Sequence, residues 1–191
     1  LLRTIALGGS AMASPMYVDA LIGTPFSVIL KDALMRQEDL RLINGNPLTG
    51  TKSCLEDSVG VKTSEITAIP EGADANEMFG WIMPRTNQFS TSRSYFSWLM
   101  GKKAYDLDAR VKGGERHIIM SGEYDSVLPM DIYGEFLIKA IIVGDIDKME
   151  QLGIYEVSPE DFALAEFVDS SKLELQRIVR QGLNMLRKEN A

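Results

Sequence analysis

Cysteine and histidine are nearly absent from this sequence of 191 residues, which has one of each, Cys54 and His117. One thiol cannot form an internal disulfide, complete a cysteine-rich zinc site or ligate an iron–sulfur cluster. This usage fits a reducing compartment. His117 alternates with apolar residues over residues 116–120, which predicts a half-exposed histidine on a strand rather than a metal ligand.

The sequence also lacks a surplus of positive charge and any long apolar run. Its formal net charge is -7 and its pI is about 4.8, so a nucleic-acid partner is not expected, and the acidic balance argues against binding to anionic lipid. The most apolar run, residues 136–143, is broken by Lys139 and is too short to span a bilayer. No signal peptide is visible, and the chain begins with Leu1 rather than Met, so we expect it to be the C-terminal part of a longer polypeptide.

Motifs for nucleotide binding and nucleophilic catalysis are missing as well. Gly8-Gly9-Ser10 follows an apolar strand, but neither a GxGxxG nor a GK[ST] pattern follows it. The two glycines predict a turn with positive φ, or a loop that lies close to a ligand or partner. Cys54 lies beside Glu56 and Asp57, which would raise the pKa of its thiol rather than activate it. We therefore expect no catalytic residue and no metal site.

The residues that are present predict an α+β chain. Residues 1–55 are expected to form one compact domain in which a helix over residues 25–36, with Thr24 as its N-cap, accompanies strands at 3–8, 17–22 and 40–43. Residues 56–115 are expected to form a mixed α/β connecting segment. It contains strands at 65–69, 79–83 and 105–111 and a short helix at 92–100.

Helical periodicity dominates residues 116–191. Helices are expected over 130–143 and 145–152, and Ser158-Pro159 marks the start of another. The last helix is predicted to begin with a capping box at Ser171. Its apolar stripe consists of Leu175, Ile178, Val179, Gly182 and Leu186.

Several short motifs resemble a known family. Residues 3–9, 22–25 and 41–50 are similar to the soluble-ligand-binding β-grasp module of respiratory complex I and related reductases. Downstream, the order of motifs resembles the A subunit of the sodium-translocating NADH:quinone reductase. These motifs are Pro70-Glu71-Gly72, Phe79-Gly80-Trp81, Asn87-Gln88-Phe89-Ser90, Val127-Leu128-Pro129-Met130-Asp131, Gly144-Asp145 and Pro159-Glu160-Asp161-Phe162-Ala163-Leu164. The resemblance implies a β-grasp-like domain followed by a mixed segment and a C-terminal helical domain.

That helical domain is similar to a ferredoxin that has lost its clusters. The related C subunit of the Rnf-type reductase carries two four-iron clusters on runs with the spacing C-x2-C-x2-C-x3-C-P. None of the eight corresponding positions is a cysteine, so the resemblance implies that packing replaces cluster ligation. The positions are Ile118, Ser121, Tyr124 and Leu128 in the first run, and Pro159, Phe162, Ala165 and Asp169 in the second.

The resemblance implies a peripheral, cofactor-free part of a respiratory complex on the cytoplasmic face of the inner membrane, with flavins and iron held by partner subunits. Its expected role is docking, chiefly to the membrane-embedded B subunit, and the fragment is expected to be non-catalytic. A redox enzyme in its own right, which binds quinone in a cleft lined by the aromatic residues between Phe79 and Trp98, is a second interpretation. A stand-alone β-grasp module for small ligands is a third. The candidate ligand or partner loops are Gly8, Gly9, Asn44 and Gly45, and the candidate interface aromatics are Phe79, Trp81 and Trp98.

Overall fold

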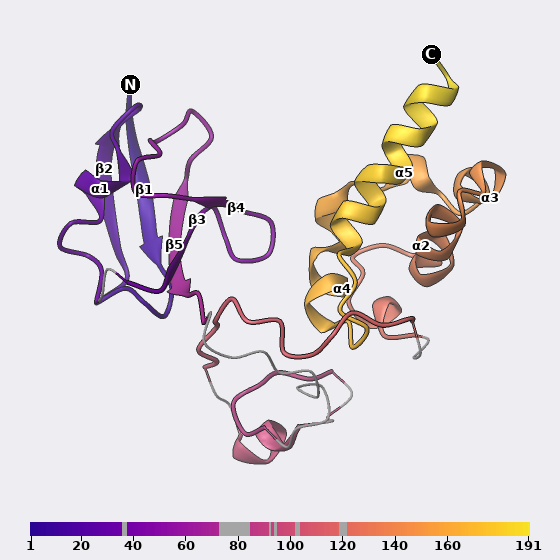
Figure 1. The fold of residues 1–191 in the computed structure, drawn as a ribbon, viewed down its shortest axis with the longest axis horizontal. Helices are drawn as coiled ribbons and strands as arrows, with labels where there is room; N and C mark the ends of the chain where they lie inside the picture. Colours follow the sequence, from indigo (N-terminus) through magenta and orange to yellow (C-terminus); the bar gives the residue numbers. More distant parts are fainter. Residues whose placement is uncertain (36–37, 73–84, 92, 94, 102–103, 119–121) are drawn as a thin grey trace. The chain divides into compact units, whose positions relative to one another are not determined.

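The fold is mixed α+β, with an open five-stranded sheet in the N-terminal part and helices in the C-terminal part (Figure 1). The structure is a computed structural model, and it describes all residues except 36–37, 73–84, 92, 94, 102–103 and 119–121. The chain divides into two compact units. The sheet unit comprises residues 1–76 and 104–111, and the helical unit comprises residues 77–103 and 112–191.

The sheet unit contains five strands in the order β2-β1-β5-β3-β4. Strands β1 and β5 are parallel, whereas the other neighbouring pairs are antiparallel. Leu7 of β1 pairs with Ile66 of β5, and Ile43 of β3 pairs with Thr67. The strands are β1 Leu2–Gly8, β2 Met16–Leu21, β3 Leu40–Asn44, β4 Thr51–Ser53 and β5 Glu65–Pro70.

Side chains alternate between the two faces of the sheet, and the apolar side chains of one face form the core of this unit. In β1, Ile5 and Leu7 are buried while Leu2 and Thr4 are exposed, because successive side chains point to opposite faces of a sheet. The helix α1, Phe26–Ile29, contributes the fully buried Phe26. The buried apolar set is Ile5, Leu7, Ala11, Met12, Ala20, Phe26, Leu30, Ala33, Leu42, Val59, Ile66 and Ala68.

The prediction of a helix over residues 25–36 was wrong in its length. The helix ends at Ile29, and the apolar positions that follow it, Leu30 and Ala33, are buried in turns instead. The Ala33 carbonyl accepts a hydrogen bond from Ala13 N at 2.9 Å, and Met35 N donates to Ala11 O at 3.0 Å. These long-range bonds satisfy the backbone groups that a longer helix would have paired within itself.

Strand β5 occupies the centre of the sheet although it lies beyond residue 55, where the sequence suggests a domain boundary. The strand predicted at 105–111 was also wrong, because this segment has no regular structure. Isolated hydrogen bonds connect this segment to the rest of the sheet unit. Ala109 N donates to Pro70 O at 2.9 Å, and Ser10 Oγ donates to Leu107 O at 2.8 Å.

The helical unit contains short helices around one core. Its elements are η1 Phe96–Met100, η2 Tyr124–Ser126, α2 Gly134–Val143, α3 Ile146–Gln151, η3 Ile154–Glu156, η4 Pro159–Phe162, α4 Ala163–Val168 and α5 Leu175–Glu189. All five residues of the stripe predicted for the last helix are buried. They pack with Leu137, Ile138, Ile141, Met149 and Phe162 from the elements before it.

Four predictions for this unit need correction, the last of them at Ser171. The predicted helix at 92–100 is a 3-10 turn that begins only at Phe96, and the helix predicted from residue 130 begins at Gly134. Residues 116–118 do not form a strand, and the rest of that predicted strand, like the one predicted at 79–83, lies outside the described residues.

Ser171 does not cap α5. The helix starts four residues later, because Lys172 has φ +58° and the Asp169 carboxylate accepts hydrogen bonds from Ser171 N and Leu173 N at 3.0 and 2.8 Å. By contrast, the predicted start at Ser158 is confirmed, since Ser158 and Asp161 form a capping box.

Candidate functional site

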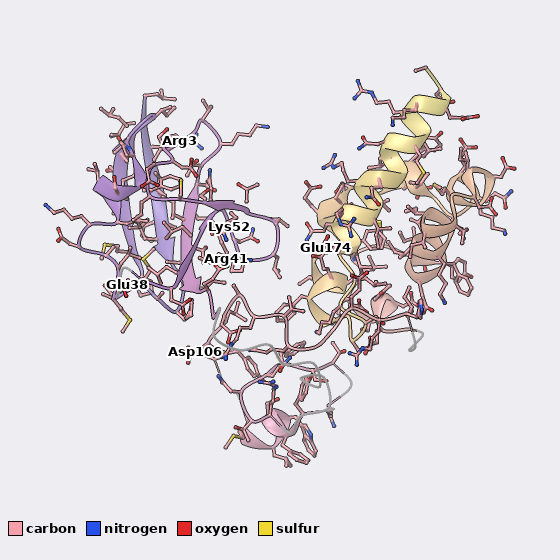
Figure 2. The ribbon with its side chains drawn as sticks, in the orientation of Figure 1. Arg3, Glu38, Arg41, Lys52, Asp106 and Glu174 are labelled. Atoms are coloured by element: carbon pink, nitrogen blue, oxygen red, sulfur yellow. The ribbon has the colours of Figure 1, made fainter. Side chains whose placement is uncertain are left out.

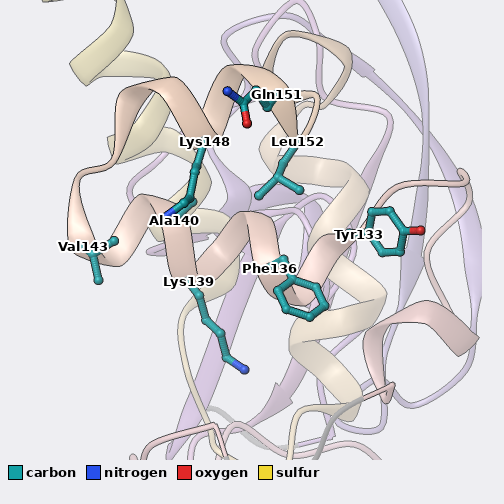
Figure 3. A pocket seen from close by; sticks show the side chains of 8 residues that line it. All are labelled: Tyr133, Phe136, Lys139, Ala140, Val143, Lys148, Gln151 and Leu152. Carbon is teal, nitrogen blue, oxygen red and sulfur yellow. The ribbon is translucent and has the colours of Figure 1, made fainter.

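The candidate site is an apolar groove on helices α2 and α3 of the helical unit (Figure 3). Its volume is about 680 Å³. Helix α2 and the residue before it supply most of the lining, and α3 with the residue after it supplies the rest. The lining residues are Tyr133, Phe136, Lys139, Ala140, Val143, Lys148, Gln151 and Leu152. We refer to this set as the α2–α3 groove.

Helix α2 is apolar on both of its faces, which explains why it can form a core and a groove together. Leu137, Ile138 and Ile141 are buried in the core of the helical unit. On the opposite face Phe136 is 61% exposed and Val143 is 74% exposed. Large apolar side chains exposed side by side on the outer face of a helix are typical of a surface that another molecule covers. The outer face of α2 is therefore suited to contact with another apolar surface.

A tight turn sets the two helices beside each other. Gly144 has φ +74° and ends α2, and its left-handed conformation favours glycine. The Asp145 side chain then accepts a hydrogen bond from Lys148 N at 3.1 Å and caps α3. Met149 of α3 is fully buried in the same core as α2. The groove thus rests on a packed helix pair rather than on a loop.

The charged side chains of the groove are already compensated by acids on their own helices. Lys139 Nζ lies 2.5 Å from Glu135 Oε1 and 5.8 Å from the centroid of the Phe136 ring. Lys148 Nζ lies 2.9 Å from Asp145 Oδ2, and this hydrogen bond raises the pKa of Lys148. The two ammonium groups therefore lie at the edge of the apolar floor, and neither of them is left without an acidic partner.

The chemistry of the lining favours binding over catalysis. None of the eight lining residues is a cysteine, histidine or carboxylate. The rings of Tyr133 and Phe136 meet edge to face with centroids 6.2 Å apart, as aromatic pairs prefer. An arrangement of two aromatic rings, aliphatic side chains and two lysines that are already in ion pairs can hold an apolar or aromatic group.

The structure uses the predicted loop glycine Gly9 for packing on the sheet. Gly9 has φ +109°, and a Cβ at this position would overlap the Ala68 carbonyl oxygen and lie 2.8 Å from the carbonyl carbon. Gly8, next to it, has open space around the position of a Cβ. The positive φ expected from the sequence is therefore found at Gly9.

The Asn44-Gly45 loop lies against the other edge of β5. Gly45 has φ +111°, its N–H donates to Glu65 O at 2.9 Å, and its carbonyl accepts from Thr67 Oγ1 at 2.8 Å. Asn44 pairs with Ile66 at the end of β3. Because β1 and β3 flank β5 on opposite sides, the two predicted loops contact different edges of that strand.

Of the predicted interface aromatics, Phe79 and Trp81 lie outside the described residues. Trp98 is 49% exposed on the 3-10 turn η1, with the Arg93 guanidinium 5.6 Å from the centroid of its ring. Trp98 does not line the α2–α3 groove.

Within the described residues, neither the single cysteine nor the single histidine belongs to a group of side chains suited to catalysis or metal binding. Cys54 is exposed, and a hydrogen bond with the Glu56 side chain raises the pKa of its thiol, as the sequence predicts. The His117 carbonyl accepts from Ser171 Oγ at 3.2 Å. Over the part of the chain that the structure describes, histidine, cysteine and carboxylate side chains form no group of three that could hold a metal ion.

The positions aligned with iron–sulfur ligands are largely core positions. Phe162 and Ala165 are fully buried, Tyr124 is 2% exposed, and Leu128 packs against the same core. Desolvation of its buried phenol raises the pKa of Tyr124. Asp169 is also buried, where it organises the backbone before α5.

Sequence reasoning did not single out the groove residues Tyr133, Phe136 and Lys148. The signal that could have found Phe136 is the apolar run at 136–143, which places apolar residues on both faces of a helix when only one face is needed for the core. No helix in the described part of the chain has the length and apolar character needed to cross a bilayer.

Comparison with known proteins agrees with the resemblance inferred from the motifs. Residues 4–54 match the family model described as "NQRA C-terminal domain". The chain is 34% identical over 188 residues, which is 98% of its length, to the A subunit of the Na(+)-translocating NADH-quinone reductase of Neisseria meningitidis serogroup B. It is 35% identical over 98% of its length to the protein of the same name from Haemophilus influenzae, and 32% identical over 98% to the one from Vibrio atlanticus.

The chain spans about two-fifths of the length of these relatives, 42%, 41% and 42% respectively. Their names describe one subunit of a multi-subunit, sodium-translocating oxidoreductase. Nearly every residue of the chain falls within the similarity, including both the sheet unit and the helical unit. The chain is therefore, over almost its whole length, a homologue of the A subunits of Na(+)-translocating NADH-quinone reductases.

Proposed function

We propose that this chain is the docking part of a peripheral subunit in a sodium-pumping NADH:quinone oxidoreductase, located on the cytoplasmic face of the inner membrane. In this proposal its α2–α3 groove receives an apolar segment of the membrane-embedded B subunit. The observation that carries the proposal is the outer face of α2, where the apolar side chains of Phe136 and Val143 are more than half exposed.

The sheet unit supports the assignment of a β-grasp-like domain. The β1–β2 hairpin is followed by α1, and β5 returns to pair with β1 in parallel. The family match at residues 4–54 covers β1 through β4. In this proposal the domain acts as a scaffold, because Gly9 and Gly45 are packed on β5. No observation favours the alternative of a stand-alone module for small ligands in these loops.

The helical unit supports the proposal of a ferredoxin-like domain without clusters. A four-iron cluster needs thiolate ligands, and the chain's one thiol, Cys54, belongs to the sheet unit. Phe162 and Ala165, which stand at two ligand positions, fill the core with apolar contacts. The proposed role is therefore cofactor-free, with flavins and iron in partner subunits.

Quinone binding is a second candidate function of the same groove. The aromatic pair Tyr133–Phe136 and the aliphatic floor suit a quinone ring and its apolar tail, and the volume of about 680 Å³ falls within the range of small-molecule sites. A quinone in the groove would exclude the docked segment. The two functions are therefore distinguished by competition: added quinone would displace a bound B subunit only if both use the groove.

The test of docking is co-purification of the complex with substitutions on α2. Phe136→Asp places a carboxylate in the groove, and we expect it to weaken association by about 30-fold or more, the effect of removing an interface hot spot. Ile142→Asp is the matched control, because Ile142 is 56% exposed on the same helix but does not line the groove. If both variants retain the B subunit equally, the groove is not the docking site.

A further inference from the structure

The floor of the α2–α3 groove offers few groups to which a partner's backbone could hydrogen-bond. Its lining is apolar apart from the ends of Tyr133, Gln151 and the two lysines, and both lysines already pair with acids of their own helices. The walls of the groove are helices, which bond their backbone groups internally and present no free edge to a strand. A segment that buries its main chain here must therefore satisfy its own N–H and C=O groups, as a helix does.

The length of the groove suits a short helix. In Figure 3 the labelled side chains lie along α2 from Tyr133, the residue before the helix, to Val143 at its end. Lining positions 133, 136, 140 and 143 repeat at intervals of three and four residues, the spacing at which one helix packs against another. At 1.5 Å per residue this stripe is about 15 Å long, so a partner helix of about three turns covers it.

The sequence that forms the groove is acidic. Residues 131–156 include the whole lining and contain six acidic residues and two lysines, a net charge of -4. The two lysines pair with Glu135 and Asp145. Four further acids are exposed and form no ion pair within the part of the chain that the structure describes: Asp131, Asp147, Glu150 and Glu156. The surplus charge of this surface is therefore negative.

Two of these acids adjoin the lining. Asp147 stands on α3 next to Lys148 and one helical turn before Gln151, and both of those residues line the groove. Asp131 stands two residues before Tyr133. Exposed carboxylates without an ionic partner thus lie close in sequence to both ends of the stripe on α2.

We infer that the groove receives a short amphipathic helix of the B subunit whose apolar face is flanked by lysine or arginine. This inference rests on the proposed docking function and specifies the chemistry of its partner. Cationic flanks would be attracted by Asp131 and Asp147, whereas acidic flanks would be repelled, because both lysines of the groove are already paired. Segments of membrane proteins next to the cytoplasmic face carry an excess of lysine and arginine, so such a helix is expected there.

Charge reversal tests the cationic flanks. The measurement is the binding of the complete A subunit to a complex that lacks it. Asp131→Lys and Asp147→Lys should each weaken binding about fivefold, mainly through slower association, and added salt should weaken binding of the parent more than that of the double variant. Glu189→Lys is the matched control, because it makes the same change of charge at an exposed position of α5 outside the lining. Its binding should stay within about twofold of the parent, since a cation at a helix C-terminus is well tolerated.

Cross-linking tests the helix. With benzoyl-phenylalanine placed at position 133 or at position 143, the two cross-linked sites in the B subunit should lie about ten residues apart, because a helix needs that many to cover about 15 Å. An extended segment would place them about four or five residues apart. The sequence around the two sites should contain lysine or arginine and no surplus of acids.

The outcomes separate this inference from docking itself. Sites four or five residues apart, a cross-linked stretch without lysine or arginine, or unchanged binding of the double variant Asp131→Lys/Asp147→Lys would overturn the inference and leave docking in place. If neither probe cross-links to the B subunit and Phe136→Asp binds as the parent does, the docking function fails and the inference fails with it. Circular dichroism checks that each variant is folded.

Discussion

Replacing Gly9 with alanine should destabilise the sheet unit, whereas the same change at Gly8 should not. Gly9 has φ +109°, and a Cβ there would overlap the Ala68 carbonyl, which accepts a hydrogen bond from Ala11 N at 3.1 Å. The backbone strain costs about 1–2 kcal/mol. Loss of the bond costs about 1 kcal/mol. The two costs add to about 2–3 kcal/mol, so we expect Gly9→Ala to lower the free energy of unfolding by up to about 3 kcal/mol.

The neighbouring glycine is the matched control. At Gly8 no atom lies within 4 Å of the place that a Cβ would occupy, and φ is not positive, so Gly8→Ala should change the free energy of unfolding by no more than about 0.5 kcal/mol. In urea monitored by far-ultraviolet circular dichroism, a loss of about 3 kcal/mol moves the midpoint down by about 1.5 M. Hydrogen exchange should show the loss in β1 and β5. Equal stability of the two variants would refute the packing role assigned to Gly9.

Two further predictions concern each unit separately. Phe162→Ala should lower the free energy of unfolding, measured by heat or urea, by about 3–5 kcal/mol because the Phe162 side chain is fully buried. Leu164→Ala is the control: Leu164 is 47% exposed, so its loss should be less than about 1 kcal/mol. Similar losses for the two variants would contradict the packing of Phe162 in the core. Arg41 and Lys52, which are labelled in Figure 2, both form ion pairs with the Glu71 carboxylate. The Arg41 guanidinium donates hydrogen bonds to this carboxylate at 2.9 and 2.6 Å, and the two cations lower the pKa of Glu71 from 4.5 to about 2. The ionised Glu71 therefore stabilises the fold above about pH 4.5, and this stabilisation is lost as the pH falls toward 2. Glu71→Gln should lower the free energy of unfolding by about 1 kcal/mol at neutral pH and should reduce its dependence on pH between about 2 and 4.5. If the pH dependence of the free energy of unfolding is the same in the variant, a group other than Glu71 is responsible for it.

Local pattern was sufficient where an element's own residues decide its structure. The α5 stripe and strands β1, β3 and β5 follow the apolar periods of their sequences, and each was predicted within one or two residues, apart from the start of α5. The capping box at Ser158 is equally local, since its hydroxyl and Asp161 are three residues apart. These features depend on neighbours along the chain, which a sequence displays directly.

Features set by distant residues were not predictable in the same way. Helix α1 is short because Ala33 and Met35 bond the backbone of residues 11–13, and α5 starts late because Asp169 holds the preceding turn. The central place of β5 depends on pairing with a strand about sixty residues earlier. The α2–α3 groove can be predicted only when the face of α2 that packs in the core is known. Phe136 therefore becomes a candidate only once Leu137 and Ile138 are known to be buried.

The α2–α3 groove is proposed to receive the membrane-embedded B subunit. The most direct test places a photoactivatable benzoyl-phenylalanine at Phe136 in the assembled complex and compares it with the same probe at Ile142, which is exposed outside the groove. Position 136 should cross-link to the B subunit, whereas position 142 should give a much weaker product. No B-subunit cross-link from position 136 in an intact complex would contradict it.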